Sequence, residues 1–274
     1  MSNTPLPAGL GPRNRERLAL LHRALPGPFT ADDAAATLGV SRDEAARIAG
    51  YLASKGWLGR VRRGLFTVVP LEAEVPESWR ADPWLVAARV FAPCYIGGWS
   101  SCEHWGLTEQ LFRSVLVVSA EPQRRARLVV QGTEFRVVRR QPDAFFGTRK
   151  VWRGRERVDV SDPTRTIVDV LDDPSIGGGI RNVAEVVDTY FAGDHRDDGL
   201  LISYADRLGN RTVFKRLGFL LESLEVDASD VIETCLSRRS AGLAKLDPSI
   251  RTSGRITKRW GLRVNAQIQA GAST

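Results

Sequence analysis

The feature that most constrains the fold is a short N-terminal segment in which two helix-start signals follow each other closely. Thr30 precedes Asp33 by three residues and Ser41 precedes Glu44 by three, and both pairs have the spacing of a capping box. Gly39 lies between them, where a glycine in the left-handed conformation ends a helix. The pattern predicts two helices joined by a tight turn.

The two predicted helices cover residues 31–38 and 42–55, and the leucine spacing of residues 13–25 predicts a third helix before them. This order is typical of a helix-turn-helix, in which the second helix of the pair enters the major groove of DNA. Its outer face would carry Arg42, Asp43, Arg47, Tyr51 and Ser54, and Ser41 would be the cap at its start. Of these, Ser41, Arg42, Arg47 and Tyr51 are the candidates for DNA contacts.

A basic hairpin is predicted after these helices. Two short strand-like runs, at residues 57–58 and 65–69, flank the loop formed by residues 59–64. Arg60, Arg62 and Arg63 lie in this loop. We expect them to contact phosphates or a minor groove, as the wing of a winged helix does.

The charge is distributed unevenly along the 274 residues. Residues 1–70 carry 10 Lys/Arg and 5 Asp/Glu, a net charge of +5, and residues 71–237 carry a net charge of −5. A basic segment of domain size favours binding to nucleic acid. We therefore interpret residues 13–70 as a winged helix-turn-helix DNA-binding domain.

The rest of the chain reads as strands followed by helices, separated from the first domain by a connector at residues 71–80. Five β-rich runs between residues 114 and 160 predict an antiparallel sheet, and five segments between residues 164 and 236 have helical spacing. This order predicts an α+β domain over residues 81–237. Residues 238–274 have a net charge of +7 and weak periodicity, which predicts a basic tail, partly ordered at best.

The search for catalytic or metal-binding groups gives little. The three histidines, His22, His104 and His195, are scattered, and the spacing of Cys94, Cys102 and His104 is not that of a zinc site. No catalytic residue, metal site or cofactor is therefore predicted. The odd number of cysteines implies no disulfide framework and favours a reducing compartment.

One further signal points away from an enzyme that acts on DNA, and a second leaves a metal site open. None of the five lysines follows an acidic residue at the Asp/Glu-x-Lys spacing of metal-dependent nucleases. Asp169, Asp172 and Asp173 gather near the end of one predicted helix and could bind Mg²⁺. A solvated helix end is the favoured interpretation.

Three motifs together resemble a known family. They are Gly59-Arg60-Val61-Arg62-Arg63-Gly64-Leu65-Phe66, the run Trp99-Ser100-Ser101-Cys102-Glu103-His104-Trp105-Gly106-Leu107, and the run Asp162-Pro163-Thr164-Arg165-Thr166-Ile167-Val168-Asp169-Val170-Leu171. In this order they resemble the AbiEi-type antitoxins of bacterial toxin–antitoxin systems, over roughly residues 13–225.

The resemblance implies a transcriptional autoregulator that represses its own operon. The winged helix would bind double-stranded promoter DNA at inverted repeats, with a dimer possible on DNA. The second domain would neutralise a nucleotidyltransferase-like toxin encoded beside it. The DNA-contacting positions implied on this chain are Ser41, Arg42, Arg47, Tyr51, Arg60, Arg62 and Arg63. The resemblance does not cover the basic tail, which would add phosphate contacts or bind an acidic surface of the toxin.

One alternative from a different class is a winged-helix transcription factor whose second domain senses a small ligand. Trp84, Trp99, Trp105 and Trp152 could line its pocket, although tryptophans more often belong to a core. No apolar run approaches the ~20 residues that span a bilayer, and no secretory signal is evident at the N-terminus. The expected location is the cytoplasm, without a membrane partner.

Overall fold

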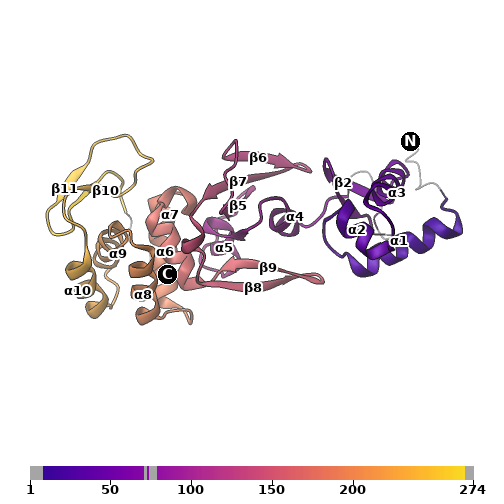
Figure 1. Cartoon of the computed structure of the whole chain (residues 1–274). Coiled ribbons are helices and arrows are strands. Elements are labelled where there is room, and N and C mark those ends of the chain that lie inside the picture. Colours follow the sequence, from indigo (N-terminus) through magenta and orange to yellow (C-terminus); the bar gives the residue numbers. More distant parts are fainter. Residues whose placement is uncertain (1–8, 71–72, 74–78, 269–274) are drawn as a thin grey trace, which may run out of the picture.

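The computed structural model describes residues 9–70, 73 and 79–268. The molecule is elongated (Figure 1). The N-terminal unit lies at one end, a mixed sheet lies in the middle, and helices with a small C-terminal sheet lie at the other end.

The N-terminal unit is built on three helices and a small sheet. Its strands have the order β1-β3-β2, and Leu21, Phe29, Leu52 and Phe66 are among the residues of its apolar core. This arrangement fits a winged helix-turn-helix. The elements are α1 (Pro12–Ala24), β1 (Phe29–Thr30), α2 (Ala31–Leu38), α3 (Arg42–Ser54), β2 (Leu58–Arg62) and β3 (Leu65–Val68).

The predicted turn signals act as expected, with one correction. Thr30 and Asp33 form a reciprocal capping box at the start of α2, and Gly39 ends that helix with φ at 66°. The hydroxyl of Ser41 accepts a hydrogen bond from the backbone N–H of Glu44 at 3.2 Å. The second capping box is wrong, however, because the Glu44 carboxylate pairs with Arg17 at 2.9 Å instead of turning back to Ser41.

The strands of residues 79–268 include a six-stranded sheet of order β6-β7-β5-β4-β9-β8. The α+β class is confirmed, but the expected antiparallel sheet is wrong, because β5 pairs parallel with β7 and β4 parallel with β9. The reason lies in the β6–β7 hairpin, whose second strand runs in the direction of β5 and inserts beside it. The strands are β4 (Cys94–Ile96), β5 (Ser114–Ser119), β6 (Arg127–Val130), β7 (Thr133–Arg139), β8 (Thr148–Arg153) and β9 (Glu156–Ser161).

Helices and the wing cover the two faces of this sheet. One face, with Phe135 and Val158, packs against α4 (Pro83–Val90) and against Val61 and Leu65 of the N-terminal unit. The other face packs against a larger core of helices. These are α5 (Gly98–His104), α6 (Pro163–Asp172), α7 (Ile180–Ala192), α8 (Asp198–Leu208), α9 (Thr212–Ser223) and α10 (Ser229–Arg238), with 3-10 turns η1 (Pro142–Ala144) and η2 (Pro174–Gly177).

The C-terminal segment is folded, so the expected weakly ordered tail is wrong for residues 239–268. It contains strands β10 (Ala244–Lys245), β11 (Arg255–Thr257) and β12 (Leu262–Val264). Leu246, Trp260 and Leu262 are fully buried with the helices of the large core. Trp260 fits against α9 only because Gly218 has no side chain, since a Cβ there would lie 2.0 Å from the indole. A few apolar residues at irregular spacing anchor this segment, and such a pattern has no periodicity. Residues 269–274 of the predicted tail lie outside the described residues.

No helix in the described part of the chain is long and apolar enough to cross a membrane.

Candidate nucleic-acid interface

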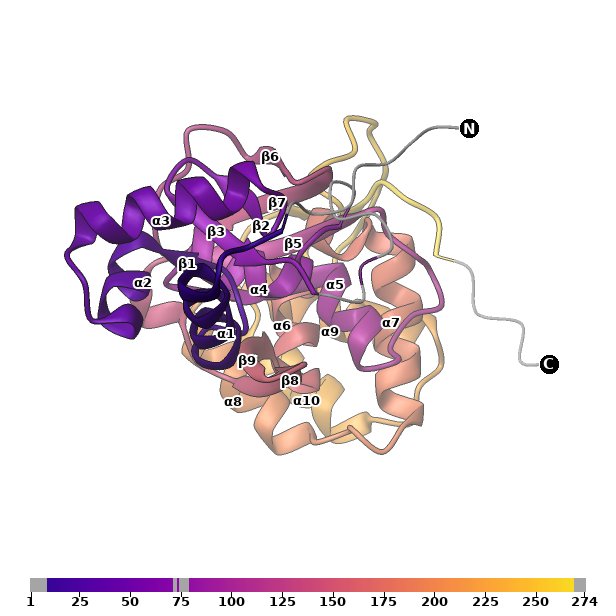
Figure 2. The same cartoon turned by 90° about the vertical axis from the view of Figure 1, so that its right-hand side faces the viewer.

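The two sides of α3 differ sharply. Ala45, Ile48, Ala49 and Leu52 form its buried stripe. Arg42, Arg47 and Tyr51 lie on the exposed side, as predicted from the sequence. Figure 2 views the molecule from its N-terminal end and shows α3 at the periphery of the unit. The exposed side of α3 is therefore open to a partner.

The contacts of these residues leave their charged groups accessible. Arg42 pairs with Asp32 at 3.0 Å, and both side chains are about two-thirds exposed. Such a pair contributes less than about 1 kcal/mol, so it opposes a new contact only weakly. Arg47 forms no ion pair with any described residue. Ser41 holds the start of the helix through its cap, which places Arg42 at the N-terminal end.

The first strand of the wing is longer than predicted, and the turn that follows it is shorter. Arg60 and Arg62 lie on β2 itself, with a register shift between them, and only Arg63 and Gly64 occupy the turn. The guanidinium of Arg60 lies 5.7 Å from the centre of the Phe66 ring. Arg62 and Arg63 are exposed and form no ion pair with the described residues.

The second domain fixes the position of the wing. Val61, which lies between Arg60 and Arg62, is 7% exposed and packs into the core on the sheet face. The side-chain amide of Gln131 donates to the carbonyl of Arg60 at 3.5 Å and accepts from the N–H of Ala81 at 3.2 Å. This contact between the wing and the second domain was not predicted from the sequence. The alternation of Val61 with Arg60 and Arg62 is nevertheless typical of a strand with one buried face.

A second joint ties α2 to α4. The Asp33 carboxylate accepts from the Thr30 N–H at 2.7 Å and also pairs with Arg89. Partial burial alone would raise the pKa of Asp33, but the hydrogen bonds from Arg89 and Thr30 outweigh it and lower the pKa below its usual value. Helix α2 is thus attached to the second domain through a charged group, in addition to the contacts of the wing.

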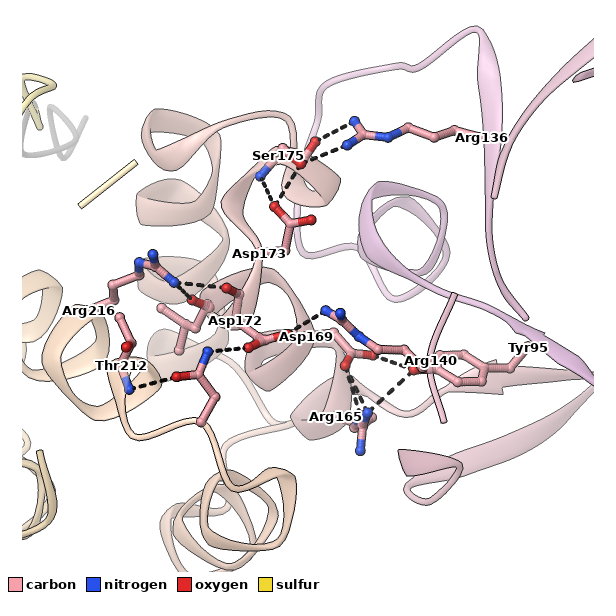
Figure 3. A network of polar contacts seen from close by, with 12 residues as sticks. Tyr95, Arg136, Arg140, Arg165, Asp169, Asp172, Asp173, Ser175, Thr212 and Arg216 are labelled. Carbon is pink, nitrogen blue, oxygen red and sulfur yellow. Dashed lines mark hydrogen bonds and ion pairs between the residues drawn. The ribbon is translucent and has the colours of Figure 1, made fainter. Parts of the chain in front are cut away.

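The acidic cluster of α6 is inside a polar network rather than in solvent (Figure 3). Asp169 pairs with Arg165 at 2.9 Å and accepts from the Tyr95 hydroxyl at 2.9 Å. Asp172 pairs with Arg140, and Asp173 accepts from the Ser175 hydroxyl at 2.7 Å. The favoured prediction of a solvated helix end is therefore wrong. The described residues contain no group of three His, Cys, Asp or Glu side chains placed to hold a metal ion.

Arg165 is the most buried residue of this network. Its side chain is fully buried, and the guanidinium lies 3.9 Å from the centre of the Phe146 ring. Its Nη1 has no hydrogen-bond partner among the described residues. Burial raises the pKa of Asp169 even though Arg165 opposes the rise. The pair therefore bears a desolvation cost, which the ion pair and the hydrogen bond from Tyr95 offset only in part.

The remaining candidate groups are engaged in packing. Burial raises the pKa of Cys94 to about 12, so its thiol stays neutral and unreactive. The Glu103 carboxylate accepts from the Phe112 N–H at 2.7 Å, and the His104 ring contacts Trp84 at 5.3 Å and Trp105 at 4.5 Å.

The four tryptophans do not line one pocket. Trp152 is 63% exposed, with Arg157 over its ring, and it alternates along β8 with Arg153, which lies over Trp84. Trp99 stacks instead on Phe112, and Trp105 donates its ring N–H to the carbonyl of Ser161.

The N-terminal unit, which carries α3 and the wing, is similar to a known family. Residues 16–69 match the family described as "Transcriptional regulator, AbiEi antitoxin". The N-terminal unit is AbiEi-like. The resemblance predicted from the sequence is thereby confirmed over these residues, and the AbiEi-like segment contains α2, α3 and both strands of the wing. The match supports a regulator of toxin–antitoxin type.

A solved structure extends the likeness in fold over nearly the whole molecule. The crystal structure of the RV2827C protein from Mycobacterium tuberculosis aligns with a TM-score of 0.63 and 18% identity, covering 93% of this chain and 92% of that one. At this identity the likeness concerns the fold alone. The search of curated proteins found no match.

Proposed function

We propose that this protein is a DNA-binding antitoxin that represses its own operon and neutralises a nucleotidyltransferase-like toxin. The AbiEi-like unit, residues 13–70, would bind double-stranded promoter DNA. Arg42, Arg47 and Tyr51 on α3 would reach base edges in the major groove, and Arg60, Arg62 and Arg63 of the wing would contact phosphates. The observation that carries the proposal is the open, cationic side of α3 and the wing, on a segment that matches this family.

The second domain, from residue 81 onward, would neutralise the toxin, and this neutralisation need not require a stable complex of the two proteins. Its acidic residues Asp169, Asp172 and Asp173 serve the internal network. Inverted repeats would place two copies of the chain on DNA, with half-sites about 34–36 Å apart or a multiple of that spacing. The expected location is the cytoplasm, where the operon and the toxin are found.

A gel-shift experiment tests the DNA-binding half. The full chain is titrated onto its own upstream DNA and onto scrambled DNA at near-physiological salt. We expect a preference of about 10³-fold or more for the upstream sequence, and its loss in the Arg42→Ala/Arg47→Ala variant. The Arg60→Gln/Arg62→Gln/Arg63→Gln variant should bind both sequences more weakly, because it loses phosphate contacts. Equal affinity for both sequences would refute a sequence-specific regulator.

Toxin neutralisation is tested separately in cells. Co-expression of the neighbouring gene product should arrest growth, and the full chain should restore it even when the three wing arginines are replaced. If neither the wild type nor the wing variant restores growth, the antitoxin role is refuted. The gel-shift result on DNA binding is unaffected by that outcome.

A ligand-responsive transcription factor remains the second candidate because of one observation. A cavity of about 540 Å³ lies between the N-terminal unit and the second domain, lined by Asp33, Arg89, Glu156 and Asp159 among others. A ligand there would change the joint that positions α2. A non-toxic neighbouring gene product, together with DNA affinity that changes when cell metabolites are added, would favour this candidate.

A further inference from the structure

The folded C-terminal segment has a surface that is almost purely cationic. Residues 238–274 hold eight Lys/Arg and one acidic residue, Asp247. Asp247 is only 1% exposed, and its carboxylate accepts from the Ile180 N–H at 3.0 Å and from the Ser249 hydroxyl at 2.6 Å. The single acidic side chain of the segment is therefore buried, whereas five of its eight cationic residues are exposed.

Some of these cations have carboxylate partners and others do not. Arg238 pairs with Asp206, and Arg259 pairs with Glu222 at 2.6 Å. Arg251, Arg255 and Lys258 are exposed, and none of the three forms an ion pair with a described residue. They lie on β11 and its two flanks, and β11 is an edge strand of its sheet.

The cations are presented on a fixed scaffold. The Trp260 ring of the same segment is buried and donates its N–H to Glu222 at 2.6 Å. The Asn265 amide donates to the Asp247 carbonyl at 2.7 Å, and Arg216 donates to the Leu246 carbonyl at 3.0 Å. The spacing of the charges is therefore set before a partner arrives, which lowers the entropy cost of binding.

We propose that Arg251, Arg255 and Lys258 form a second nucleic-acid-binding surface, which contacts phosphate groups. It lies at the end of the molecule opposite to α3 and the wing (Figure 1), so it is distinct from the promoter-reading surface. One chain would thereby hold nucleic acid at both ends, and the second contact would be independent of sequence.

The side-chain chemistry favours phosphates over a protein partner. The exposed neighbours of the three cations include the hydroxyls of Thr252 and Ser253, and Arg, Lys, Thr and Ser are the usual donors to phosphate oxygens. Protein hot spots are enriched in Trp, Tyr and Arg, but the tryptophan of this segment is buried. On β11 one large apolar side chain, Ile256, is exposed to 50%, which is a small apolar area for a protein partner.

The test compares two full-length variants that lose the same charge. The first carries Arg251→Gln, Arg255→Gln and Lys258→Gln. The matched control carries Arg149→Gln, Lys150→Gln and Arg196→Gln, which removes three cations from the acidic middle region, where Lys150 and Arg196 already have carboxylate partners. Affinity for a random duplex of about 30 base pairs is measured by fluorescence anisotropy over a salt series.

Each phosphate contact contributes about 0.9 to the slope of log K against log salt. We expect the first variant to lose about 2–3 units of slope and the control to lose almost none. The first variant should keep its preference for the upstream DNA over scrambled DNA, because α3 is untouched. Removing the wing arginines as well should abolish the remaining binding to random DNA.

Equal slopes for the wild type and the first variant would overturn the proposal. So would a first variant that binds DNA normally but no longer rescues cells from the toxin, because the surface would then belong to an acidic protein partner. These outcomes are separable from failure of the promoter-binding function, in which the wild type itself shows no preference for its upstream DNA.

Discussion

Several arginines of the N-terminal unit are exposed to solvent, whereas two arginines of the second domain are buried. Arg47, Arg62 and Arg63 are exposed on α3 and the wing. Arg165 and Arg216 are 0% and 3% exposed in the second domain. One residue type therefore has two different uses in the same chain.

The difference lies in where the guanidinium donors are directed. Arg216 donates to the carbonyls of Leu171 and Asp172, at 2.7 and 2.8 Å, and so caps the C-terminal end of α6. It also donates to Leu246 and Lys245, which joins the C-terminal segment to α6. All three of its guanidinium nitrogens donate hydrogen bonds within the structure, whereas the guanidinium groups of Arg62 and Arg63 form no ion pair with the described residues. Buried arginines should therefore affect stability, and exposed ones should affect binding.

The largest effect is expected at the buried pair. Arg165→Met would leave the Asp169 carboxylate buried without its cation, which costs about 3–5 kcal/mol of unfolding free energy. The exposed Arg62→Gln should change stability by less than about 0.5 kcal/mol. Urea unfolding of the two variants, followed by circular dichroism, measures both.

A double variant sharpens this test. Arg165→Met combined with Asp169→Leu removes both charges, so it should recover much of the loss, because an apolar pair of similar volume is often as stable as a buried ion pair. If the double variant is no more stable than Arg165→Met, the cost lies in packing against Phe146 and Tyr95 rather than in the unpaired carboxylate.

The next largest effect is expected at the joint between α6 and the C-terminal segment. Arg216→Met leaves the buried carbonyls of Leu171 and Leu246 without this donor, and we expect a total cost of about 1–3 kcal/mol, because the other two carbonyls are only part-buried. The segment from residue 239 should then become sensitive to protease under native conditions. Continued resistance of this segment would show that Trp260 and Leu262 alone hold it, and Gly218→Ala, which displaces Trp260, is the comparison variant.

Local signals in the sequence were enough to predict the N-terminal unit. Thr30, Gly39 and Ser41 act through their own backbone neighbours, so their effects are readable from spacing. The exposure of Arg42, Arg47 and Tyr51 followed from helical periodicity for the same reason. Whether these residues contact DNA remains a prediction.

Long-range contacts account for what the sequence analysis missed. Arg165 and Asp169 are an ordinary exposed pair by their spacing, and only the arrival of Tyr95 and Phe146 from other elements buries them. The parallel pairing of β4 with β9 joins residues 64 positions apart at Ile96 and Val160. Val61 lies on β2 of the wing, but its side chain packs into the core on the face of the six-stranded sheet. No window of local periodicity contains these partners.

A smaller effect, on binding alone, is expected for the helix face. Arg42→Ala or Arg47→Ala should cost about 1–3 kcal/mol on the cognate site and relax sequence preference, because a bidentate contact to a base edge is lost. Stability should stay within about 0.5 kcal/mol of the wild type. Arg13→Ala on α1 is the matched control. Equal losses on cognate and random DNA would show that these side chains contact phosphates only.

The smallest effect, and the one that depends on pH, is expected at Asp33. Its folded-state pKa lies below the unfolded value, so its carboxylate stabilises the fold fully above the unfolded pKa. That contribution is lost as the pH falls from about 4 through the folded pKa. Asp33→Asn should therefore lower the unfolding free energy by about 0.5–1 kcal/mol at pH 7. The difference in melting temperature from the wild type should be constant between pH 8 and pH 5 and should narrow below about pH 4.

Arg89→Met separates the two partners of this carboxylate. If Arg89 is responsible for most of the shift, Asp33→Asn should have a smaller effect in the Arg89→Met background than in the wild type, which a double-mutant cycle detects. An undiminished effect would assign the shift to the Thr30 cap within α2. Asp33 would then serve the N-terminal unit alone, and the joint between the two regions would rest on the wing residues Val61 and Leu65 and on Gln131.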